Sequence, residues 1–373
     1  MRPQITVTLF LLTAGMTAFA QPKTRLAWVG LELDGGWNFI QHAQQEPEAE
    51  LVAVAEPHPD LLERARRSTK PGVRFYADYI RMLDEVKPDA VLSTTPNNQH
   101  VEILRACAAR GIHVWFQKPM ATNLKDAREM ERLAREAGIV LMINYWNLWE
   151  PAMQALTARV QAGDTGPVER FVSRNAFPAS KNAATRAMSE YYFNYFHDSV
   201  RHGGGAIVDQ GTYGIDYALW LMGRPARVFA LGKQLRALPG LAAEDDGWVF
   251  LDYPKATAVV WGGWWVLPDT APGIGENTIT GPKGILSRAS GVVTFTPGAE
   301  PDKGVQTGPA QAVALPTIPP ERRNGVAHFV DCIRHHKPVE APHSAALNVT
   351  VHEVLEAAYE SIRTGRAIVL TEH

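Results

Sequence analysis

The sequence predicts a two-domain α/β protein, in which a doubly wound parallel sheet precedes a second domain with a mostly antiparallel sheet. Two observations predict this fold class. Between Lys23 and about Asn144, short apolar runs alternate with amphipathic helical segments, as in parallel strands joined by helices. After Pro151, strand-like runs with period-two alternation follow one another across turn residues, which favours antiparallel pairing.

Each element of the first domain is marked by its own pattern. The first strand is the apolar run TRLAWVG at residues 24–30, and the helix-like segment GGWNFIQHAQQ follows at residues 35–45. Later strands are expected at residues 51–55, 90–94, 113–116 and 139–144, and helices at residues 59–68, 78–86, 101–109 and 124–137. Gly111 and Gly138 follow the last two helices, at the position where glycine commonly ends a helix.

The second domain begins with a helix at residues 151–162. Strands are expected at residues 168–175, 226–235, 247–253, 257–265 and 284–295, and a proline-rich surface connection at residues 297–320. Helices at 321–335 and 344–364 and a strand at 367–370 close the chain. We assign residues 21–145 to the first domain and 146–373 to the second. Whether the last helices pack back on the first domain is left open.

The overall composition excludes several kinds of partner. Lysine and arginine nearly balance aspartate and glutamate, the formal net charge is −2, and no basic tract is present. The chain therefore offers no electrostatic surface for nucleic acid or for an anionic membrane. Cys107 and Cys332 lie far apart inside helix-like patterns, which favours buried thiols over a disulfide framework.

The first 20 residues have the pattern of a signal peptide. Arg2 precedes an apolar run at residues 5–19, and Ala18-Phe19-Ala20 fits the small-x-small rule for cleavage. The run is too short for a membrane span, so no stable membrane insertion is expected. We predict a Sec-type signal peptide cut after Ala20 and a periplasmic or extracellular protein. A chain exported unfolded does not carry a cofactor bound beforehand.

The stretch VGLELDGGWNF, residues 29–39, connects the first strand to the first helix. A strand, a glycine turn and a helix form the first unit of a dinucleotide-binding fold, in which the helix N-terminus faces the pyrophosphate. Gly30 and Gly35 fit the glycine pattern GxGxxG, but Glu32 replaces its middle glycine, and a carboxylate there repels phosphate. Glu56 ends the second strand, where an acid binds the adenosine ribose hydroxyls.

Lys118 lies just beyond the predicted strand at residues 113–116. Ligands of open α/β sheets bind at the carboxyl ends of such strands. A lysine held there beside apolar groups loses hydration, which lowers its pKa toward a range useful for acid–base chemistry. The alternative interpretation is an ordinary exposed lysine in a loop.

Several motifs, in order, resemble the Gfo/Idh/MocA family. They are TPNNQH (95–100), FQKPMATN (116–123), GGGAIVDQGTYGIDYALWLMG (203–223) and HFVDCIRHHKPVEAP (328–342). The resemblance covers essentially the whole chain after the signal peptide. It implies a Rossmann domain, an α/β domain with an open-faced sheet, and a homo-oligomer that pairs through that sheet. It also implies an NAD(P)-dependent oxidoreductase acting on a small-molecule sugar or polyol.

The resemblance assigns roles to individual residues. Lys118, Asp209 and Tyr213 fall on the catalytic positions around the reacting hydroxyl, with Tyr213 in place of the usual histidine. A nearby ammonium would lower the pKa of this tyrosine, so that a Lys–Tyr pair transfers the proton. The cofactor-binding positions fall on Gly30, Gly35, Glu56, Asn97, His100 and Gln117, with NAD or NADP as cofactor.

Two further groups of residues are weaker candidates. His197 and His202 precede the glycines of the third motif and are expected to bind or border the sugar; their spacing matches no strong metal-ligand motif, and no metal is expected. In the run WGGWW, Trp261 and Trp265 share one face of a strand and Trp264 takes the other. One face is expected in a subunit interface, with stacking on sugar rings as the alternative.

Three functions remain open at this point. The first is an exported oxidoreductase that acts on a sugar or polyol with a nicotinamide cofactor. The second is a cofactor-independent carbohydrate lyase, hydratase or glycosidase that uses Lys118, Asp209 and Tyr213 as acid and base. The third is a sugar-binding protein without chemistry.

Overall fold

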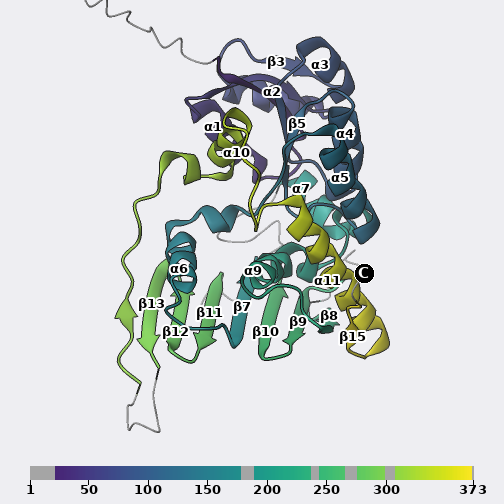
Figure 1. Cartoon of the computed structure of the whole chain (residues 1–373). Coiled ribbons are helices and arrows are strands. Elements are labelled where there is room, and N and C mark those ends of the chain that lie inside the picture. The colour runs from purple at the N-terminus through teal and green to yellow at the C-terminus, as the bar shows by residue number, and fades with distance from the viewer. Residues whose placement is uncertain (1–21, 178–188, 237–242, 265–274, 299–306, 372–373) are drawn as a thin grey trace, which may run out of the picture.

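The computed structural model describes residues 22–177, 189–236, 243–264, 275–298 and 307–371. The predicted signal peptide and Trp265 lie outside these ranges. The described residues form two layered units, one on each side of a central junction (Figure 1). No helix in this part of the chain combines the length and the apolarity needed to cross a bilayer.

The first unit is a six-stranded, all-parallel sheet in the order β3-β2-β1-β4-β5-β6. The order reverses between β1 and β4, which creates the crevice where ligands of such sheets bind. Its strands are β1 (Thr24–Val29), β2 (Ala49–Ala55), β3 (Arg74–Tyr76), β4 (Ala90–Ser93), β5 (His113–Gln117) and β6 (Leu141–Asn144). Its helices are α1 (Gly36–Gln45), α2 (Pro59–Ser68), α3 (Tyr79–Val86), α4 (His100–Ala108) and α5 (Leu124–Ala137).

Local chemistry explains where these helices begin and end. The Asp78 side chain accepts hydrogen bonds from the first backbone N–H groups of α3, and the Asn123 side chain does the same for α5. Gly138 ends α5 with a φ of 64°, which an L-residue with a side chain rarely adopts. Cys107 and Cys332 are buried free thiols, as predicted.

The second unit is built on a nine-stranded sheet in the order β14-β13-β12-β11-β7-β10-β9-β8-β15. Its pairings are antiparallel except for β7 with β10. The strands are β7 (Arg170–Ala176), β8 (Arg227–Lys233), β9 (Asp246–Tyr253), β10 (Ala256–Gly263), β11 (Glu276–Gly281), β12 (Gly284–Ala289), β13 (Val292–Pro297), β14 (Gln311–Ala312) and β15 (Ile368–Val369). The predicted fold class is therefore confirmed.

Several details differ from the sequence-based expectation, and the short strands β3 and β14 are among them because neither was expected. The segment expected as one strand at residues 284–295 is a hairpin, β12 and β13, because Ser290 and Gly291 both take positive φ and turn the chain back. Strand β11 was not expected, since its sequence ENTITG is short and polar.

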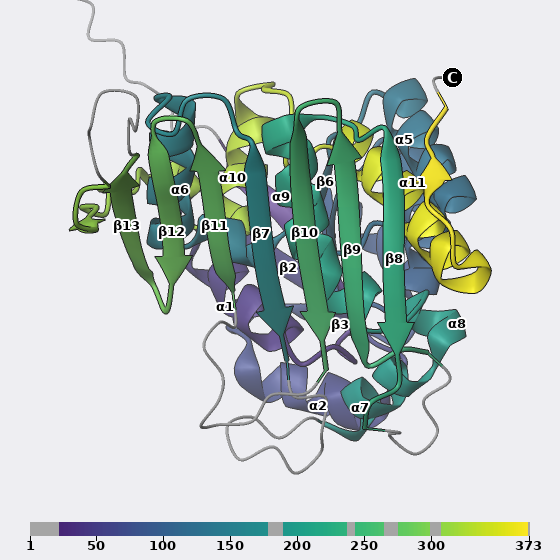
Figure 2. The same ribbon diagram turned by 90° about the horizontal axis from the view of Figure 1, so that it is seen from below.

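Among the described residues, helices cover one face of the large sheet and leave the other open. Figure 2 shows the uncovered strands, with α6 (Pro151–Gln161), α9 (Thr212–Met222) and α11 (Ala345–Thr364) behind them. The two C-terminal helices return to the first unit: α10 (Gly325–Arg334) contacts α1, and α11 contacts α5 (Figure 1). The remaining helices are α7 (Glu190–His197) and α8 (Ser199–His202), followed by a π-helical turn at Ile207–Gly211.

Glycines allow α9 and the π-helical turn to lie directly on the sheet. A Cβ atom at Gly214 would lie 2.8 Å from the Ser173 and Val260 side chains. A Cβ atom at Gly262 of β10 would lie 2.6 Å from the backbone of Ala206 and Gly211. These close approaches determine how near α9 and the π-helical turn lie to the sheet, and therefore where the side chains of these two elements contact the first unit.

We expect Gly214→Ala to lower the free energy of unfolding by about 1–2 kcal/mol, because the added methyl overpacks the contact with β7 and β10. This cost exceeds the roughly 1 kcal/mol that alanine gains over glycine in an open helix. Urea denaturation followed by circular dichroism measures it. Gly211→Ala is the control, because its Cβ would meet only the Ile207 side chain at 3.5 Å. Equal stability of the two variants would contradict the packing argument.

Candidate active site

Lys118 joins the two units through a buried ion pair. It follows the last residue of β5 at the carboxyl edge of the parallel sheet, as predicted, and is only 7% exposed. Its Nζ donates to the Asp209 carboxylate Oδ1 and to the Asp209 backbone carbonyl, both at 2.6 Å. An exposed loop lysine is therefore not what the structure shows.

Asp209 lies in the π-helical turn, a conformation often found at functional sites. Its second oxygen, Oδ2, accepts hydrogen bonds from Trp264 Nε1 at 2.9 Å and Gln210 Nε2 at 2.7 Å. Burial alone would raise the pKa of Asp209, but the charge of Lys118, the neighbouring His202 and the hydrogen bonds hold that pKa below its ordinary value. Asp209 is therefore a carboxylate at neutral pH.

Tyr213 contacts Lys118 through its ring. The Lys118 Nζ lies 4.5 Å from the ring centroid, and this cation–π contact stabilises the ammonium. Tyr145 and Trp146 approach the same ring edge-on. Proton transfer by the Tyr213 hydroxyl stays a prediction.

A cavity of about 660 Å³ contains the three predicted catalytic residues. Its aromatic walls are Phe39, Trp146, Trp149, Phe177 and Tyr192, and its polar lining includes Asn38, His42, Gln117, Gln210 and Asn324. Trp146 lines this cavity and is 47% exposed. An aromatic cavity of this size with a few converging polar groups suits a small polyhydroxy molecule.

The other predicted residues take different places. His100 is fully buried against the Phe116 ring, between the Thr95 and Met120 carbonyls, and burial lowers its pKa to about 4. Asn97 donates its amide to the His202 carbonyl at 2.7 Å, and its Oδ1 has no partner among the described residues. His100 and Asn97 thus hold neighbouring backbone segments together at the edge of the sheet.

The two histidines expected at the substrate differ in position. His202 lies beside Asp209 and Lys118, and burial lowers its pKa to about 4, so it is neutral at physiological pH. His197 bonds the Phe193 carbonyl at 2.8 Å within α7, and it is not among the residues that line the cavity.

The turn from β1 to α1 keeps part of the chemistry of a phosphate site. Gly30 has a φ of 84° and lies against Thr95, and Gly36 lies against Thr94, so both approaches exclude a side chain. Helix α1 begins without a side-chain cap and without an acid in its first turn. The positive end of this helix would stabilise an anion placed there.

Glu32 is paired in the structure. It is 7% exposed, its Oε2 accepts from Arg201 Nη2 at 2.6 Å, and its Oε1 lies 3.6 Å from His58 Nε2. A neighbouring guanidinium compensates the carboxylate charge. The repulsion of phosphate expected from Glu32 is therefore reduced while Arg201 stays in place.

The space in front of the turn is filled by α7 and its neighbours. Leu33 packs with Tyr195, Phe196 and Trp264 in a buried cluster. The cavity between the turn, Lys118 and α7 measures about 30 Å³, which is room for a water molecule. The chemistry of the turn suits a dinucleotide, but the space does not, so a nicotinamide dinucleotide does not fit this conformation.

Glu56 is also engaged. Its side chain is fully buried and accepts from the Leu31 backbone N–H at 2.6 Å and the His58 backbone N–H at 2.9 Å. Burial raises its pKa. The carboxylate expected to bind ribose hydroxyls thus closes the turn onto the end of β2.

Sequence reasoning missed several of these contacts. Trp264 binds Asp209, and the only signal was its place on the face of WGGWW opposite to Trp261. Trp261 instead pairs with Trp248, with ring centroids 6.1 Å apart. No pattern indicated Arg201 as the partner of Glu32, because 169 residues separate them.

We expect Lys118→Met to lower the free energy of unfolding at pH 7 by about 3–5 kcal/mol, because Asp209 is left as an unpaired buried charge. In this variant unopposed burial raises the pKa of Asp209 above its unfolded value of about 3.9, so the deficit shrinks as pH falls toward that value and the carboxyl takes up a proton. Urea denaturation at several pH values measures both effects. The double variant Lys118→Met with Asp209→Asn is expected to recover most of the loss; no recovery at pH 7 would contradict the pair.

Two family models match the chain. The model of the oxidoreductase family with an NAD-binding Rossmann fold, GFO_IDH_MocA, matches residues 25–145, and the GFO/IDH/MocA C-terminal domain matches residues 153–287.

Named proteins are similar over different lengths. The rhizopine catabolism protein MocA of Rhizobium meliloti is 26% identical over 55% of this chain and 60% of its own length, so the match spans less than two thirds of that relative. The scyllo-inositol 2-dehydrogenase (NAD(+)) of Bacillus subtilis (strain 168) is 23% identical over 93% of this chain and 96% of its own length.

Among solved structures, the aldose-aldose oxidoreductase of Caulobacter crescentus, complexed with glycerol, shares the fold. It has a TM-score of 0.75 and 23% identity, and the match covers 93% of this chain and all of that one. With both halves matched by models of one family, the chain belongs to the GFO/IDH/MocA family of oxidoreductases.

Proposed function

We propose that this protein is a carbohydrate oxidoreductase that acts on a hydroxyl-bearing carbon of a sugar or polyol. The observation that carries the proposal is the buried Lys118–Asp209 pair, 2.6 Å apart, in the wall of an aromatic cavity of about 660 Å³. The inositol dehydrogenase and the glycerol-complexed oxidoreductase among the similar proteins support a polyhydroxy substrate.

Lys118 Nζ is the group that donates or accepts the proton of the reacting hydroxyl. Asp209 occupies two of the three N–H donors of the ammonium, through its carboxylate and its carbonyl, which leaves one for a substrate oxygen. When an external hydride donor reduces a sugar carbonyl, this N–H donates its proton to the carbonyl oxygen. In the reverse direction the hydride leaves to an external acceptor and the hydroxyl proton returns to Lys118 Nζ beside the Asp209 carboxylate.

A nicotinamide, as NAD or NADP, would supply hydride transfer in this family of enzymes. Because it does not fit the conformation described, we assign it no step. Its binding requires that α7 and α8 move away from the turn that carries Leu33 and Glu32.

One observation favours a second function. The cavity in front of the glycine turn measures about 30 Å³, whereas the cavity beside Lys118 measures about 660 Å³ and is lined by all three predicted catalytic residues. Lys118, Asp209 and Tyr213 would then serve as acid and base for a carbohydrate lyase, hydratase or glycosidase without any nucleotide.

We also propose export and self-association. The N-terminal pattern described above supports export through a Sec-type signal peptide. The open face of the large sheet (Figure 2) supports pairing of copies. Leu231 of β8 is 46% exposed, and Trp248, Phe250 and Trp261 on β9 and β10 are half-buried. Such a patch is typical of an interface.

We expect Leu33→Ala to bind NADH at least about tenfold more tightly than the wild-type protein. Removing this contact weakens the packing of α7 on the turn, and each 1.4 kcal/mol lost raises the population of the open form about tenfold. Fluorescence titration of the mature protein measures the affinity, with Leu231→Ala on the open sheet face as the control. Equal affinity of wild type and variant would show that α7 does not restrict binding, and absence of binding in every variant would exclude the nicotinamide.

We expect sugar or polyol turnover coupled to a nicotinamide to fall at least about 100-fold in Lys118→Met, since the proton donor is lost. The matched control is Lys125→Met, which removes an exposed lysine of α5. The assay records NAD(P)H absorbance with a panel of sugars and polyols, and product formation without nucleotide in parallel. Turnover without nucleotide that is lost in Lys118→Met would establish the second function; unchanged turnover in that variant would remove both mechanisms.

A further inference from the structure

Three glycines lead into the π-helical turn that carries Asp209, and each is held closely by another segment. A Cβ atom at Gly203 would lie 2.9 Å from the Thr122 backbone, one at Gly204 2.3 Å from the Tyr359 hydroxyl, and one at Gly205 about as close to the Glu244 carbonyl. Real Cβ atoms do not make such contacts, so the glycines allow Glu244 and Tyr359 to reach the backbone.

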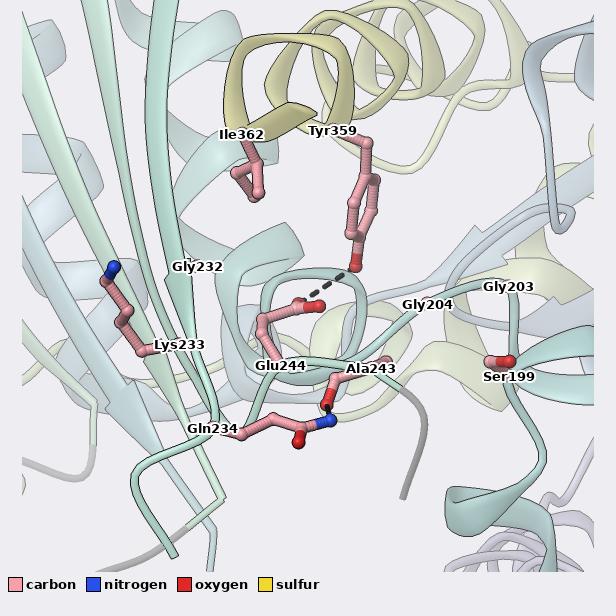
Figure 3. A pocket seen from close by; sticks show the side chains of 10 residues that line it. All are labelled: Ser199, Gly203, Gly204, Gly232, Lys233, Gln234, Ala243, Glu244, Tyr359 and Ile362. Carbon is pink, nitrogen blue, oxygen red and sulfur yellow. Dashed lines mark hydrogen bonds between the residues drawn. The ribbon is translucent and has the colours of Figure 1, made fainter. Parts of the chain in front are cut away.

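Three hydrogen bonds connect these two residues to the backbone of residues 205–207, and a fourth joins them to each other. The Tyr359 hydroxyl accepts from the Gly205 N–H at 2.9 Å and donates to Glu244 Oε1 at 2.9 Å. The same Oε1 accepts from the Ile207 N–H at 2.9 Å, and the Glu244 carbonyl accepts from the Ala206 N–H at 3.0 Å. Figure 3 shows Tyr359 reaching down from α11 to the Glu244 carboxylate beside the glycine backbone. We call this arrangement the Glu244–Tyr359 clamp.

The clamp acts on the residues directly before Asp209. Ile207 is the first residue of the π-helical turn, and the first N–H groups of a helix need acceptors from outside it. The Gly205 carbonyl in turn accepts from the Asp209 N–H at 3.1 Å. Two successive hydrogen bonds, from the Gly205 N–H to Tyr359 and from the Asp209 N–H to the Gly205 carbonyl, therefore connect the clamp to the residue that carries the carboxylate.

Burying the Glu244 carboxyl of the clamp costs free energy. Glu244 is 8% exposed, and burial raises the pKa of its carboxyl to about 7, against the effect of its hydrogen bonds. Burying a carboxyl costs free energy that an apolar side chain would not. A polar pair at this position, despite that cost, indicates that Glu244 and Tyr359 contribute more to the geometry of the backbone before Asp209 than to stability.

We propose that Glu244 and Tyr359 are positioning residues that fix the Asp209 carboxylate against Lys118. The part of this inference that concerns catalysis rests on the proposed function, whereas the placement of Asp209 is measurable without substrate. Neither residue touches the cavity that holds Lys118, so their effect passes through the backbone of residues 205–209.

The test compares Tyr359→Phe with Tyr253→Phe in the full mature chain. Both variants lose one tyrosine hydroxyl, from the partly buried Tyr359 and from the buried Tyr253, but the Tyr253 hydroxyl has no hydrogen-bond partner among the described residues. Hydrogen exchange followed by mass spectrometry reports the backbone at residues 203–211. The indole N–H resonance of Trp264, assigned by its loss in Trp264→Phe, reports the Asp209 carboxylate.

In Tyr359→Phe we expect exchange at residues 203–211 to rise at least tenfold, the Trp264 resonance to shift, and kcat to fall with KM little changed. Tyr253→Phe leaves all of these at wild-type values. Glu244→Gln keeps an acceptor for the Ile207 N–H and is expected to show a smaller change than Glu244→Ala.

Unchanged exchange and an unchanged Trp264 resonance in Tyr359→Phe would overturn the proposal, as would a rise in exchange that is uniform along the chain. A local rise together with a wild-type protein inactive on every sugar would uphold the placement of Asp209 and reject the proposed function instead.

Discussion

The arrangement of both units depends on one buried ion pair. Lys118 comes from the edge of the parallel sheet and Asp209 from a turn resting on the antiparallel sheet, so the pair forms only when the units dock at one depth. Buried charges are tolerated when their remaining hydrogen-bonding capacity is met. Trp264 and Gln210 satisfy the second carboxylate oxygen, and the Tyr213 ring faces the ammonium. The glycines of α9 and β10 set the depth that makes these contacts possible.

The glycine turn and the segment that covers it form one electrostatic unit. Glu32 would weaken phosphate binding in an open crevice, but α8 supplies Arg201 to it. The same segment supplies the apolar side chains that fill the crevice. Charge compensation and loss of space therefore come together, and a ligand that displaces the segment meets an uncompensated carboxylate. The chain belongs to a family with an NAD-binding fold, and yet its crevice is filled. The segment that fills the crevice is the one that supplies Arg201 to Glu32, and this link connects the two observations.

Much of the fold and the centre of the site could be predicted from the sequence. Alternation of apolar runs and helices fixes the parallel sheet, and the motifs around Lys118 and Asp209 place both residues at its edge. The contacts that compensate the charge of Glu32 and position Asp209 could not be predicted. Arg201 is 169 residues from Glu32, and Tyr359 is 115 residues from Glu244. Such pairs follow no periodic pattern, because they depend on how distant segments pack once the fold has formed.

The filled crevice also changes what holds the first unit together. A nucleotide-binding fold gains stability from its ligand by mass action, in proportion to the logarithm of ligand concentration. Here Phe196 and Tyr195 of α7 pack on the turn from within the chain, so this apolar contact is intramolecular and does not vary with the concentration of a diffusible molecule.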